Sequence, residues 1–494
     1  MYGLLPLFDT RAARLLDARA TTLLGGDGYA LMQRAGQAAW QHLLQHWPAA
    51  QRITVVCGPG NNGGDGYVLA RLAHRSGRIV KVLHLAEHVP ATELSQRACT
   101  DYVAVGGEIG IFPEVVPQGD VVVDALFGIG LSRAPDAFAT ALIDAVNGQP
   151  APVLALDVPS GLDADKGSVL GKAVTASRTL QFIARHAGLQ TGEALEHTGE
   201  LALEGLQVPA EVLSAVEPGA LLLTREALSY WLLPRRRNTH KGESGRALCI
   251  GGDHGHGGAL LLCAEAALRS GAGLLSVATR EAHVPAMLAR RPEAMARAVE
   301  SGDELKPLFS RVDAIAIGPG LGQGDWGRAM LKLALAAGKP LVLDADALNL
   351  IATESYALGD AILTPHPGEA ARLLGIDTVE VQHDRFAAAQ AIAESYQAVV
   401  VLKGAGTIIA APGQAPRVLD AGNPGMAVGG MGDVLTGVIV ALRASGLSAF
   451  DAASAGALLH SLAGDAAAEE GERGLLPSDL FPFLRRLANP EGTD

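Results

Sequence analysis

Several features that would assign this chain to a particular class of protein are scarce or absent. Aromatic residues make up only 4% of the 494 residues, and the four cysteines show neither CxxC nor cysteine–histidine ligand spacing. The net charge is −13, and the only basic run is Arg235-Arg236-Arg237. These deficits disfavour an aromatic-rich all-β fold, a disulfide framework, a zinc site and nucleic-acid binding. The cysteine content fits a reducing cytoplasm.

No segment reads as a targeting signal or a membrane span. The first residues carry no basic residue before Arg11 and already include Asp9, unlike a secretory signal. The longest apolar stretch, residues 259–278, is interrupted by Glu265 and Arg269. Because a transmembrane helix needs about 20 residues with almost no charge, we expect a soluble protein without membrane contact.

Glycine and aliphatic residues are abundant instead, with 60 glycines and a hydrophobic content of 49%. A chain of this length forms at least two domains in most cases. In the first half, predicted strands at residues 53–57, 79–85, 121–124 and 153–157 alternate with predicted helices at 67–75, 92–103 and 137–146. This alternation predicts a parallel sheet with helices on both faces.

The same alternation starts again after a junction that contains prolines and glycines, around residues 208–227. The predicted strands of the second half are residues 247–250, 274–278, 314–317, 340–344, 361–364 and 399–402, and the predicted helices are 257–270, 326–337, 384–395, 433–444 and 452–469. We therefore expect an α/β chain with two domains, at residues 1–216 and 224–490.

The first glycine-rich segment, residues 59–66, directly follows the predicted strand 53–57. It reads Pro-Gly-Asn-Asn-Gly-Gly-Asp-Gly and is predicted to be a loop that leads into the helix 67–75. A tight turn favours the same residue types. However, glycines also let backbone amides approach an anion, and a helix dipole adds attraction. No Gly-Lys-Ser/Thr follows, so the segment is not a Walker loop, and we interpret it as a site for a phosphorylated ligand.

Two aspartates, Asp124 and Asp157, lie at the carboxyl ends of predicted strands, and the carboxyl ends of parallel strands meet at one edge of a sheet. A role for each as a helix cap or a turn former is an equally good interpretation. Together with Asn62 and Ser160 they form a candidate site for a weakly held monovalent cation, or for proton transfer to a ligand. We expect these strand ends to converge on one pocket.

Shorter motifs in the second half are less specific. His254 and His256 lie in a glycine-rich segment, but no third ligand has matching spacing for a metal. The segment 318–322, Gly-Pro-Gly-Leu-Gly, is a phosphate-type turn after a strand. His366 stands between two prolines, which suits either a hydrogen bond to a ligand or simply a rigid turn. Residues 403–407 are predicted to leave a strand as a hairpin whose lysine and threonine reach nucleotide phosphates.

The most specific signal in the second half is the loop 423–433, which ends Gly430-Met431-Gly432-Asp433 directly before a predicted helix. Its amides can form an anion hole at the helix N-terminus. Asp433 can accept the proton of a substrate hydroxyl that attacks a terminal phosphate. An N-cap role would explain the aspartate but not the glycines.

Taken together, these motifs resemble one family closely, the bifunctional NAD(P)H-hydrate repair enzymes, which fuse an epimerase domain to an ADP- or ATP-dependent dehydratase domain. The resemblance covers nearly the whole chain. In the first half it rests on residues 31–32, 35–36, 61–66, 124–128 and 157–161, and in the second half on 240–242, 271–273, 318–322, 344–348, 364–369, 403–407 and 423–436.

For the first domain, the resemblance implies a Rossmann-like three-layer parallel sheet that interconverts the R and S epimers of hydrated NADH and NADPH (NADHX and NADPHX). Asp157 would be the catalytic residue beside the reacting ring. Potassium would bind Asn62, Asp124 and Ser160. The residues that would hold the substrate are Asn61, Asn62, Gly63, Gly64, Asp65, Gly128, Ile129, Gly130, Leu131, Ser132 and Asp157.

For the second domain, the resemblance implies a ribokinase-like fold that dehydrates the S epimer at the expense of ADP, giving AMP and phosphate. Asp433 would be the catalytic base, and magnesium would accompany the nucleotide. The hydrate would contact Ala259, Gly322, His366 and Asp433, and the nucleotide would contact Lys403, Gly404, Ala405, Gly406, Thr407, Gly430, Met431 and Gly432.

The resemblance further implies a cytoplasmic isomerase and lyase that assembles as a homo-oligomer, such as a tetramer, without nucleic-acid or membrane partners. One departure is visible: residues 253–257 lack the serine and tyrosine commonly found after the double glycine. The side chains on that wall of the dehydratase pocket are therefore not predicted. The alternative is a ribokinase-like vitamin-precursor kinase whose first domain binds a nucleotide without catalysis.

Overall fold

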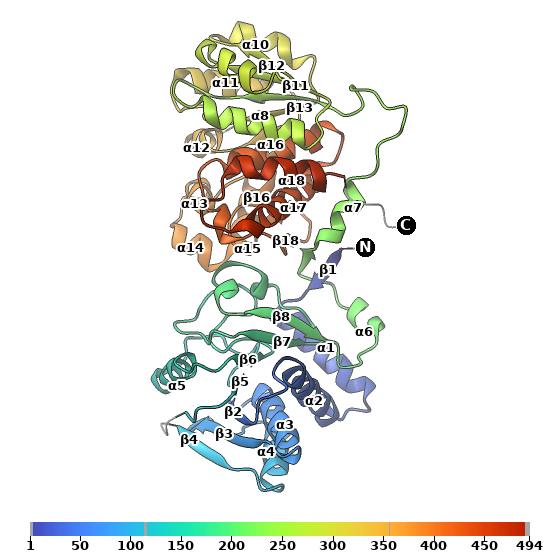
Figure 1. Ribbon diagram of the computed structural model, residues 1–494, viewed down its shortest axis with the longest axis vertical. Helices are drawn as coiled ribbons and strands as arrows, with labels where there is room; N and C mark the ends of the chain where they lie inside the picture. The colour runs from blue at the N-terminus through green and yellow to red at the C-terminus, as the bar shows by residue number, and fades with distance from the viewer. Residues whose placement is uncertain (1–2, 113–115, 355, 490–494) are drawn as a thin grey trace. The chain divides into compact units, whose positions relative to one another are not determined.

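The computed structural model describes residues 3–112, 116–354 and 356–489. The chain divides into two compact units, which separate between Ala220 and Leu221, inside the predicted junction (Figure 1). One difference from the expected domain 1–216 concerns its first residues. The chain up to Leu5 belongs to the second unit, because strand β1 (Leu4–Leu7) lies beside β9 (Ala220–Leu223) in the sheet of that unit.

The first unit is built on a seven-stranded sheet in the order β4-β3-β2-β5-β6-β7-β8. Every neighbouring pair in it is parallel. The strands are β2 (Arg52–Cys57), β3 (Ile79–Leu85), β4 (Ile109–Phe112), β5 (Val121–Ala125), β6 (Val153–Leu156), β7 (Arg178–Phe182) and β8 (Glu200–Glu204). The expected parallel α/β sheet is therefore confirmed.

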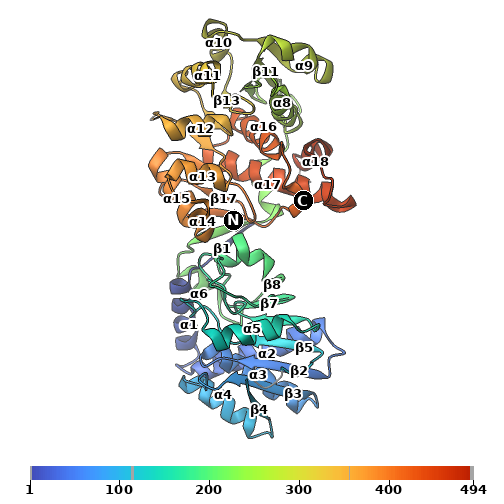
Figure 2. The same ribbon diagram turned by 90° about the vertical axis from the view of Figure 1, so that its left-hand side faces the viewer.

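Helices cover both faces of this sheet (Figures 1 and 2). On one face, α2 (Gly28–His46), α3 (Asn61–Arg75) and α4 (Glu93–Val103) share a core with the strands. On the other face, Leu142 and Ile143 of α5 (Ala137–Asn147) pack on Val56 and Val122. Helix α1 (Thr10–Leu23) contributes Ala13, Leu16 and Ala20 to a third cluster. The carboxyl edge of the sheet stays accessible between these layers.

The first glycine-rich segment is not a loop, which corrects the sequence-based prediction. Helix α3 begins at Asn61, so residues 61–66 form its first turns instead of preceding a helix at 67–75. Glycine is a poor helix former, but here it is required by packing. A Cβ at Gly63 would lie 2.0 Å from the carbonyl oxygen of Gly58. The glycines therefore let the start of the helix lie directly on the end of strand β2.

The second unit contains an eleven-stranded sheet in the order β1-β9-β18-β17-β16-β15-β14-β13-β10-β11-β12. Neighbouring strands are parallel along the order β16-β15-β14-β13-β10-β11-β12 and between β18 and β9, whereas β17 pairs antiparallel with both β16 and β18. The strands after β9 are β10 (Arg246–Ile250), β11 (Leu274–Thr279), β12 (Met295–Ala298), β13 (Ala314–Ile317), β14 (Leu341–Leu343), β15 (Ala361–Leu363), β16 (Val399–Leu402), β17 (Ile408–Ala410) and β18 (Arg417–Leu419).

Two helical layers flank the second sheet (Figure 2). One layer buries a large aliphatic core and contains α8 (Gly257–Arg269), α16 (Met431–Ala444), α17 (Ala449–Ala467) and α18 (Leu480–Leu487). The other contains α11 (Asp325–Ala336), α12 (Asp346–Thr353), α13 (Pro367–Leu374) and α15 (Arg385–Tyr396). Among the described residues, no helix combines the length and the hydrophobicity that crossing a membrane requires.

Helix α3 generates the first prediction. Gly63→Ala should lower the free energy of unfolding by about 2–3 kcal/mol, because the added methyl group forces the helix start away from Gly58. Gly60→Ala is the matched control: nothing lies within 4 Å of a Cβ there, and losing glycine at an N-cap costs less than about 1 kcal/mol. Chemical denaturation of both variants would measure the difference, and equal losses would contradict the packing argument.

Candidate functional sites

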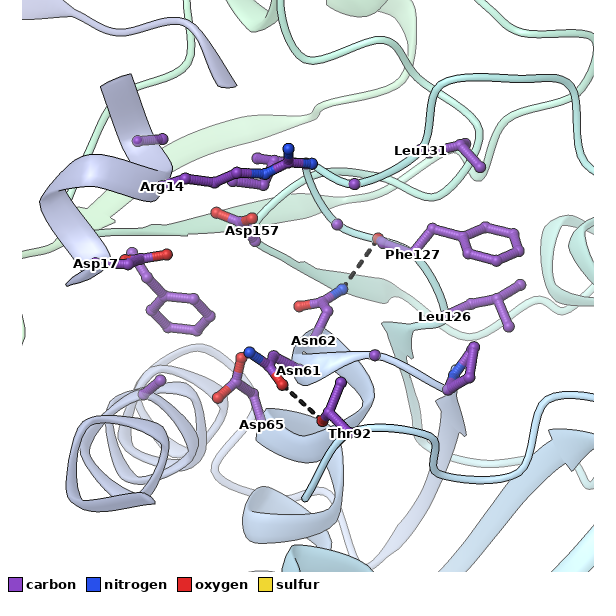
Figure 3. A pocket seen from close by; sticks show the side chains of 18 of the residues that line it. Arg14, Asp17, Asn61, Asn62, Asp65, Thr92, Leu126, Phe127, Leu131 and Asp157 are labelled. Atoms are coloured by element: carbon purple, nitrogen blue, oxygen red, sulfur yellow. Dashed lines mark hydrogen bonds between the residues drawn. The ribbon is translucent and has the colours of Figure 1, made fainter. Parts of the chain in front are cut away.

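A cavity of about 800 Å³ opens at the carboxyl end of the first sheet (Figure 3). The strand order reverses between β2 and β5, where open parallel sheets leave a crevice for a ligand. The walls of the cavity are formed by the start of α3, by the loops after β5 and β6, and by α1 and α2. The predicted substrate residues that line it are Asn61, Asn62, Asp65, Gly128, Ile129, Gly130, Leu131, Ser132 and Asp157.

The other two predicted substrate residues, Gly63 and Gly64, are buried in α3 and do not line the cavity. A Cβ at Gly64 would lie 2.4 Å from Cε of Met32 on α2, so this glycine lets the two helices pack closely. No side chain caps the N-terminus of α3. Its first amides are thus available to a ligand at the positive end of the helix dipole.

The predicted cation residues form a cluster behind the cavity wall. Asp124 is almost fully buried and does not line the cavity, contrary to the expectation that it would converge there. Its Oδ1 accepts a hydrogen bond of 2.7 Å from Ser160 Oγ, and its Oδ2 accepts one of 2.8 Å from the Ser160 amide. Burial raises the pKa of Asp124 to about 6, although the bonds from Ser160 oppose that shift.

Asn62 connects this cluster to the cavity. Its Nδ2 donates to the carbonyl oxygen of Phe127 over 3.0 Å, and the Phe127 amide donates to Ser160 Oγ over 2.8 Å. Among the described residues, the buried Oδ1 of Asn62 has no hydrogen-bond partner. A buried acceptor without a donor costs about 1–3 kcal/mol, so this atom requires a donor or a cation.

Asp157 has an unusual backbone conformation directly after β6. Its φ is +65°, and the Val158 amide bonds the Leu156 carbonyl over 2.8 Å, which closes a γ-turn around it. Positive φ is costly outside glycine, and such strain clusters at functional sites. The turn directs the carboxylate into the cavity, where its Oδ1 lies 2.9 Å from Nε2 of His186.

Sequence reasoning missed His186. It follows β7, a strand that was not predicted, and its imidazole is fully enclosed. Burial by itself would lower the pKa of His186, but the charge and hydrogen bond of Asp157, with help from Asp17, raise it overall. The raised pKa favours the protonated form of His186, in which Nε2 donates a hydrogen bond to Asp157. No motif surrounds it in the sequence that could have revealed this role.

Two further carboxyl groups reach the same cavity, from α1 and from α3 (Figure 3). Desolvation by the cavity walls, reinforced by the charge of Asp157, raises the pKa of Asp17 to about 7, although water still reaches this side chain. Burial and the same neighbours raise the pKa of Asp65 well above its ordinary value. The cavity therefore holds one carboxyl group, Asp17, that can exchange protons near neutral pH, beside a second whose neutral form is favoured by burial.

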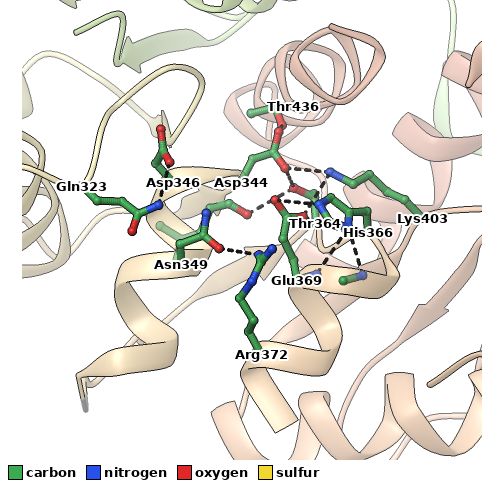
Figure 4. Close-up of polar contacts among 12 residues, drawn as sticks. Gln323, Asp344, Asp346, Asn349, Thr364, His366, Glu369, Arg372, Lys403 and Thr436 are labelled. Carbon is green, nitrogen blue, oxygen red and sulfur yellow. Dashed lines mark hydrogen bonds and ion pairs between the residues drawn. The ribbon is translucent and has the colours of Figure 1, made fainter. Parts of the chain in front are cut away.

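The candidate site of the second unit is centred on Asp344, at the carboxyl end of β14 (Figure 4). Its Oδ1 lies 2.9 Å from Nζ of Lys403 and 2.8 Å from Oγ1 of Thr364, and its Oδ2 accepts a bond of 2.8 Å from Thr436. Burial opposes ionisation of Asp344, yet Lys403, Thr436 and Thr364 together hold its pKa below the ordinary value.

Asp433 lies beside this ion pair, in the first turn of α16. Gly430 is the N-cap of the helix, with φ +98°, and no side chain caps it. A Cβ at Gly432 would lie 3.1 Å from Nζ of Lys403. Burial and the charge of Asp344 raise the pKa of Asp433 to about 7. The loop thus combines a helix N-terminus that no side chain caps with a carboxyl that can take up a proton at neutral pH.

The predicted hairpin at residues 403–407 is confirmed by the antiparallel pairing of β16 and β17. Its lysine side chain does not extend outward: Nζ of Lys403 lies between Asp344 and Glu369, 3.7 Å from the latter. The buried Arg385 supports the loop from behind, donating to the carbonyl oxygens of Leu402 and Lys403. Thr407 donates to the Gly404 carbonyl over 3.0 Å.

His366 is the N-cap of α13. Its Nδ1 accepts hydrogen bonds from the amides of Gly368, over 3.0 Å, and Glu369, over 3.3 Å. About half of the His366 side chain remains exposed, and its Nε2 lies 3.5 Å from Glu369 Oε1. The structural role considered for this residue is therefore present, and a hydrogen bond from its outer edge to a ligand is still sterically allowed.

Gly322 lies between two carboxylates. Its amide donates to Oδ2 of Asp346 over 2.9 Å, and a Cβ there would lie 2.9 Å from Oδ2 of Asp253. Asp253 is held by Nε of Arg280 at 2.8 Å. These side chains occupy the wall that the sequence left undefined. Ala259 lies in the first turn of α8. No cluster of three or more His, Cys, Asp or Glu side chains suited to a metal occurs among the described residues.

Known proteins are similar to both units of the chain. The family model described as NAD(P)H-hydrate dehydratase matches residues 247–486, and the model described as YjeF-related protein N-terminus matches residues 28–188. A bifunctional NAD(P)H-hydrate repair enzyme of Coxiella burnetii is 49% identical over 98% of this chain and 99% of its own length. The Escherichia coli K12 protein of the same description is 45% identical over 97% and 93%.

Among solved structures, a ribokinase-like superfamily protein of Enterococcus faecalis V583 resembles the second unit. It is 31% identical, has a TM-score of 0.52, and covers 55% of this chain and 98% of its own. This similarity confirms the ribokinase-like fold predicted for the second domain.

The backbone beside Asp344 gives a second prediction. Ala345 has φ +47° and ψ −117°, a conformation that favours glycine and costs a side chain about 1–3 kcal/mol. Ala345→Gly should therefore raise the free energy of unfolding by about 1 kcal/mol, after the entropy cost of glycine. The control is Ala329→Gly, on an exposed position of α11, which should lose about 1 kcal/mol. A loss of the same size in both variants would contradict backbone strain at Ala345.

Proposed function

The chain belongs to the family of bifunctional NAD(P)H-hydrate repair enzymes, and from this premise we propose how its residues divide the two reactions. The first unit is an NAD(P)H-hydrate epimerase, and the second is an NAD(P)H-hydrate dehydratase that consumes a nucleotide. One observation carries the assignment of residues: each unit brings a carboxyl group, Asp157 or Asp433, next to a helix N-terminus that no side chain caps.

In the epimerase, the cavity binds the hydrate with its phosphates toward the amides of α3 and the loop 128–132. These amides and the dipole of α3 attract anions without requiring basic side chains. Asp157, fixed by its γ-turn and by His186, lies beside the ring carbon that carries the hydroxyl. It exchanges a proton with that hydroxyl or with water as the configuration of the carbon inverts.

A potassium ion fits the cluster behind this wall. The partnerless Oδ1 of Asn62, the carboxylate of Asp124 and the Ser160 hydroxyl are the oxygen ligands that a hard cation prefers. Such an ion would supply positive charge and would keep Asp124 ionised. The side chains hold the loop after β5 in place through Phe127.

In the dehydratase, Asp433 removes the proton from the hydroxyl of the S hydrate. The resulting oxygen attacks the terminal phosphate of ADP, and AMP leaves. Loss of phosphate and of a ring proton then restores the nicotinamide double bond. The amides of residues 430–432 stabilise the transferred phosphoryl group. The loop 403–407 holds the nucleotide, while Ala259, Gly322 and His366 contact the hydrate. Magnesium bound with the nucleotide would neutralise phosphate charge.

We place the enzyme in the cytoplasm, consistent with four cysteines that all remain free thiols. ADP, not ATP, is the proposed phosphoryl donor.

A mixture of both hydrate epimers tests the two activities together. With ADP, the wild-type chain should restore the absorbance of the reduced nicotinamide completely. Asp157→Asn should stop at the fraction of the S epimer, since asparagine tolerates positive φ but does not exchange a proton. Asp433→Asn should restore almost none, a loss of at least about 10³-fold in rate.

Parallel reactions with ATP decide the phosphoryl donor. Release of free phosphate, measured beside absorbance, separates a dehydratase from a kinase. A stable phosphorylated product without recovery of absorbance would refute the dehydratase assignment. Complete recovery by Asp157→Asn would refute the role of Asp157.

The pH dependence of dehydration follows from Asp433. Its pKa near 7 means that the basic form is lost as the pH falls through that value. The kcat/KM of dehydration should therefore fall about tenfold per pH unit below about pH 7 and level off above it, because this ratio reports ionisation of the free enzyme. A kcat/KM that stays constant down to pH 5, in a chain shown to remain folded, would contradict this role.

A further inference from the structure

The pocket face of α1 carries a carboxyl group that the epimerase assignment does not use. Ala13, Arg14, Asp17 and Thr21 all line the cavity, and their spacing of three to four residues places them on one stripe of the helix. The core-facing residues Leu16 and Ala20 lie on the adjoining stripe. Helix α1 therefore contributes one complete face to the cavity.

Asp17 has no structural task that accounts for its position. Among the described residues it makes no hydrogen bond and no ion pair, and the N-cap of α1 is Asp9. Water within the cavity reaches its side chain. A carboxyl group that supports neither its helix nor a neighbouring segment is available to a ligand.

The groups around Asp17 come from several elements. The nearest charges that act on it are Asp157, after β6, and His186, after β7. Asp65 on α3 also lines the cavity and lies within the electrostatic influence of both aspartates, and Arg14 lies one turn away from Asp17 on α1. Figure 3 shows Asp17 and Asp157 approaching the same space from different walls. His186 bonds Asp157 and not Asp17, so the two carboxyl groups have different hydrogen-bonding surroundings.

We propose that Asp17 is a second catalytic acid–base residue of the epimerase, working opposite the Asp157–His186 pair. This inference rests on the proposed epimerase function. The hydrate carries its hydroxyl on a carbon bonded to the ring nitrogen, so the nitrogen lone pair can expel the hydroxyl once the oxygen is protonated. Inversion then needs one group to protonate the departing oxygen and another to deprotonate the water that returns.

One epimer is converted to the other in two stages, the loss of water and its return. Asp17 donates its proton to the hydroxyl oxygen, the carbon–oxygen bond breaks, and water leaves as a carbon–nitrogen double bond forms. Water adds to the other face, the electron pair returns to nitrogen, and the proton of that water passes to Asp157. Asp157 then releases its proton to solvent and Asp17 takes one up from solvent, which restores both groups for the next turnover. The opposite conversion uses the same groups with their roles exchanged. The pKa of Asp17, about 7, leaves both its forms populated for this exchange.

The test uses the full chain and follows exchange between the two epimers without nucleotide, so that the dehydratase is idle. Asp17→Asn should lower kcat for exchange by at least about 100-fold, with KM changed by less than about threefold, because general acid–base groups contribute 10²–10⁴-fold to rate. Dehydration of the S epimer with ADP by the same protein should stay unchanged. The control is Asp144→Asn, an exposed position on α5 paired with Lys172, which should alter neither activity.

Asp17→Glu separates proton transfer from structure. Glutamate keeps the carboxyl group, so this variant should recover at least about tenfold of the kcat lost in Asp17→Asn and should move the pH profile of exchange. Wild-type exchange in Asp17→Asn would overturn the proposal. A loss confined to KM, or a pH profile of Asp17→Glu identical to that of the wild type, would do the same.

The outcome for Asp17 is distinguishable from failure of the epimerase function itself. If the wild-type chain exchanges no epimers, the proposed function fails and Asp17 with it. If the wild type exchanges epimers, Asp157→Asn loses exchange and Asp17→Asn keeps it, only the inference on Asp17 fails. If Asp17→Asn lowers the thermal midpoint, the pH profile of Asp17→Glu decides: a shifted profile supports the role and an unshifted one overturns it.

Discussion

Both sites depend on close contact between backbone segments. In one, the end of a strand lies against the start of a helix, and in the other it lies against the end of a neighbouring strand. In the first unit, a Cβ at Gly63 would lie 2.0 Å from the Gly58 carbonyl. In the second unit, Gly318 has φ +133°, and a Cβ there would lie 1.8 Å from the carbonyl of Asp344. Glycine is the residue that permits this approach. In each site, backbone amides and strand ends therefore lie close enough together to contact the same ligand.

The electrostatic design is also shared. Asp344 is paired with Lys403, and the neighbouring Asp433 is left with a pKa near 7. Asp157 is paired with His186, and Asp17 is left with a pKa near 7. In each case burial raises the pKa of the second carboxyl group, and the charge of the neighbouring aspartate raises it further. Two carboxyl groups with different proton affinities can act as acid and base in one pocket.

Much of this architecture could be predicted from sequence, because buried parallel strands appear as short apolar runs. Every predicted strand is present, with ends within one residue of the prediction. Some missed strands lack that pattern: β8 is only partly buried, and β7 carries the polar side chains of Thr179 and Gln181 in its buried interior. Others, such as β9 and β17, are apolar runs of four and three residues that were not recognised as strands. The first turns of α3 were misread as a loop because helix propensity disfavours glycine, whereas packing requires it.

The candidate sites were predicted less completely than the fold. Motif residues such as Asp433 stand beside glycines that reveal a turn, so their surroundings mark them. The pKa values of Asp17 and His186 are raised in part by the charge of Asp157, a residue distant from both in the chain. Only the folded chain brings these groups together, and a single sequence contains no record of such contacts.

The raised pKa values also resolve a conflict between this acidic chain and its anionic ligands. With a net charge of −13, repulsion of phosphates would be strong if every carboxyl group in the sites were ionised. Burial raises the pKa of both Asp65 and Asp17, which favours their neutral forms and so reduces the negative charge that a dinucleotide meets in the epimerase cavity. In the dehydratase site the repulsion of phosphates is reduced in a different way. Asp344 and Glu369 outnumber the single ammonium of Lys403, so a nucleotide accompanied by a divalent cation fits this site better than a bare polyphosphate.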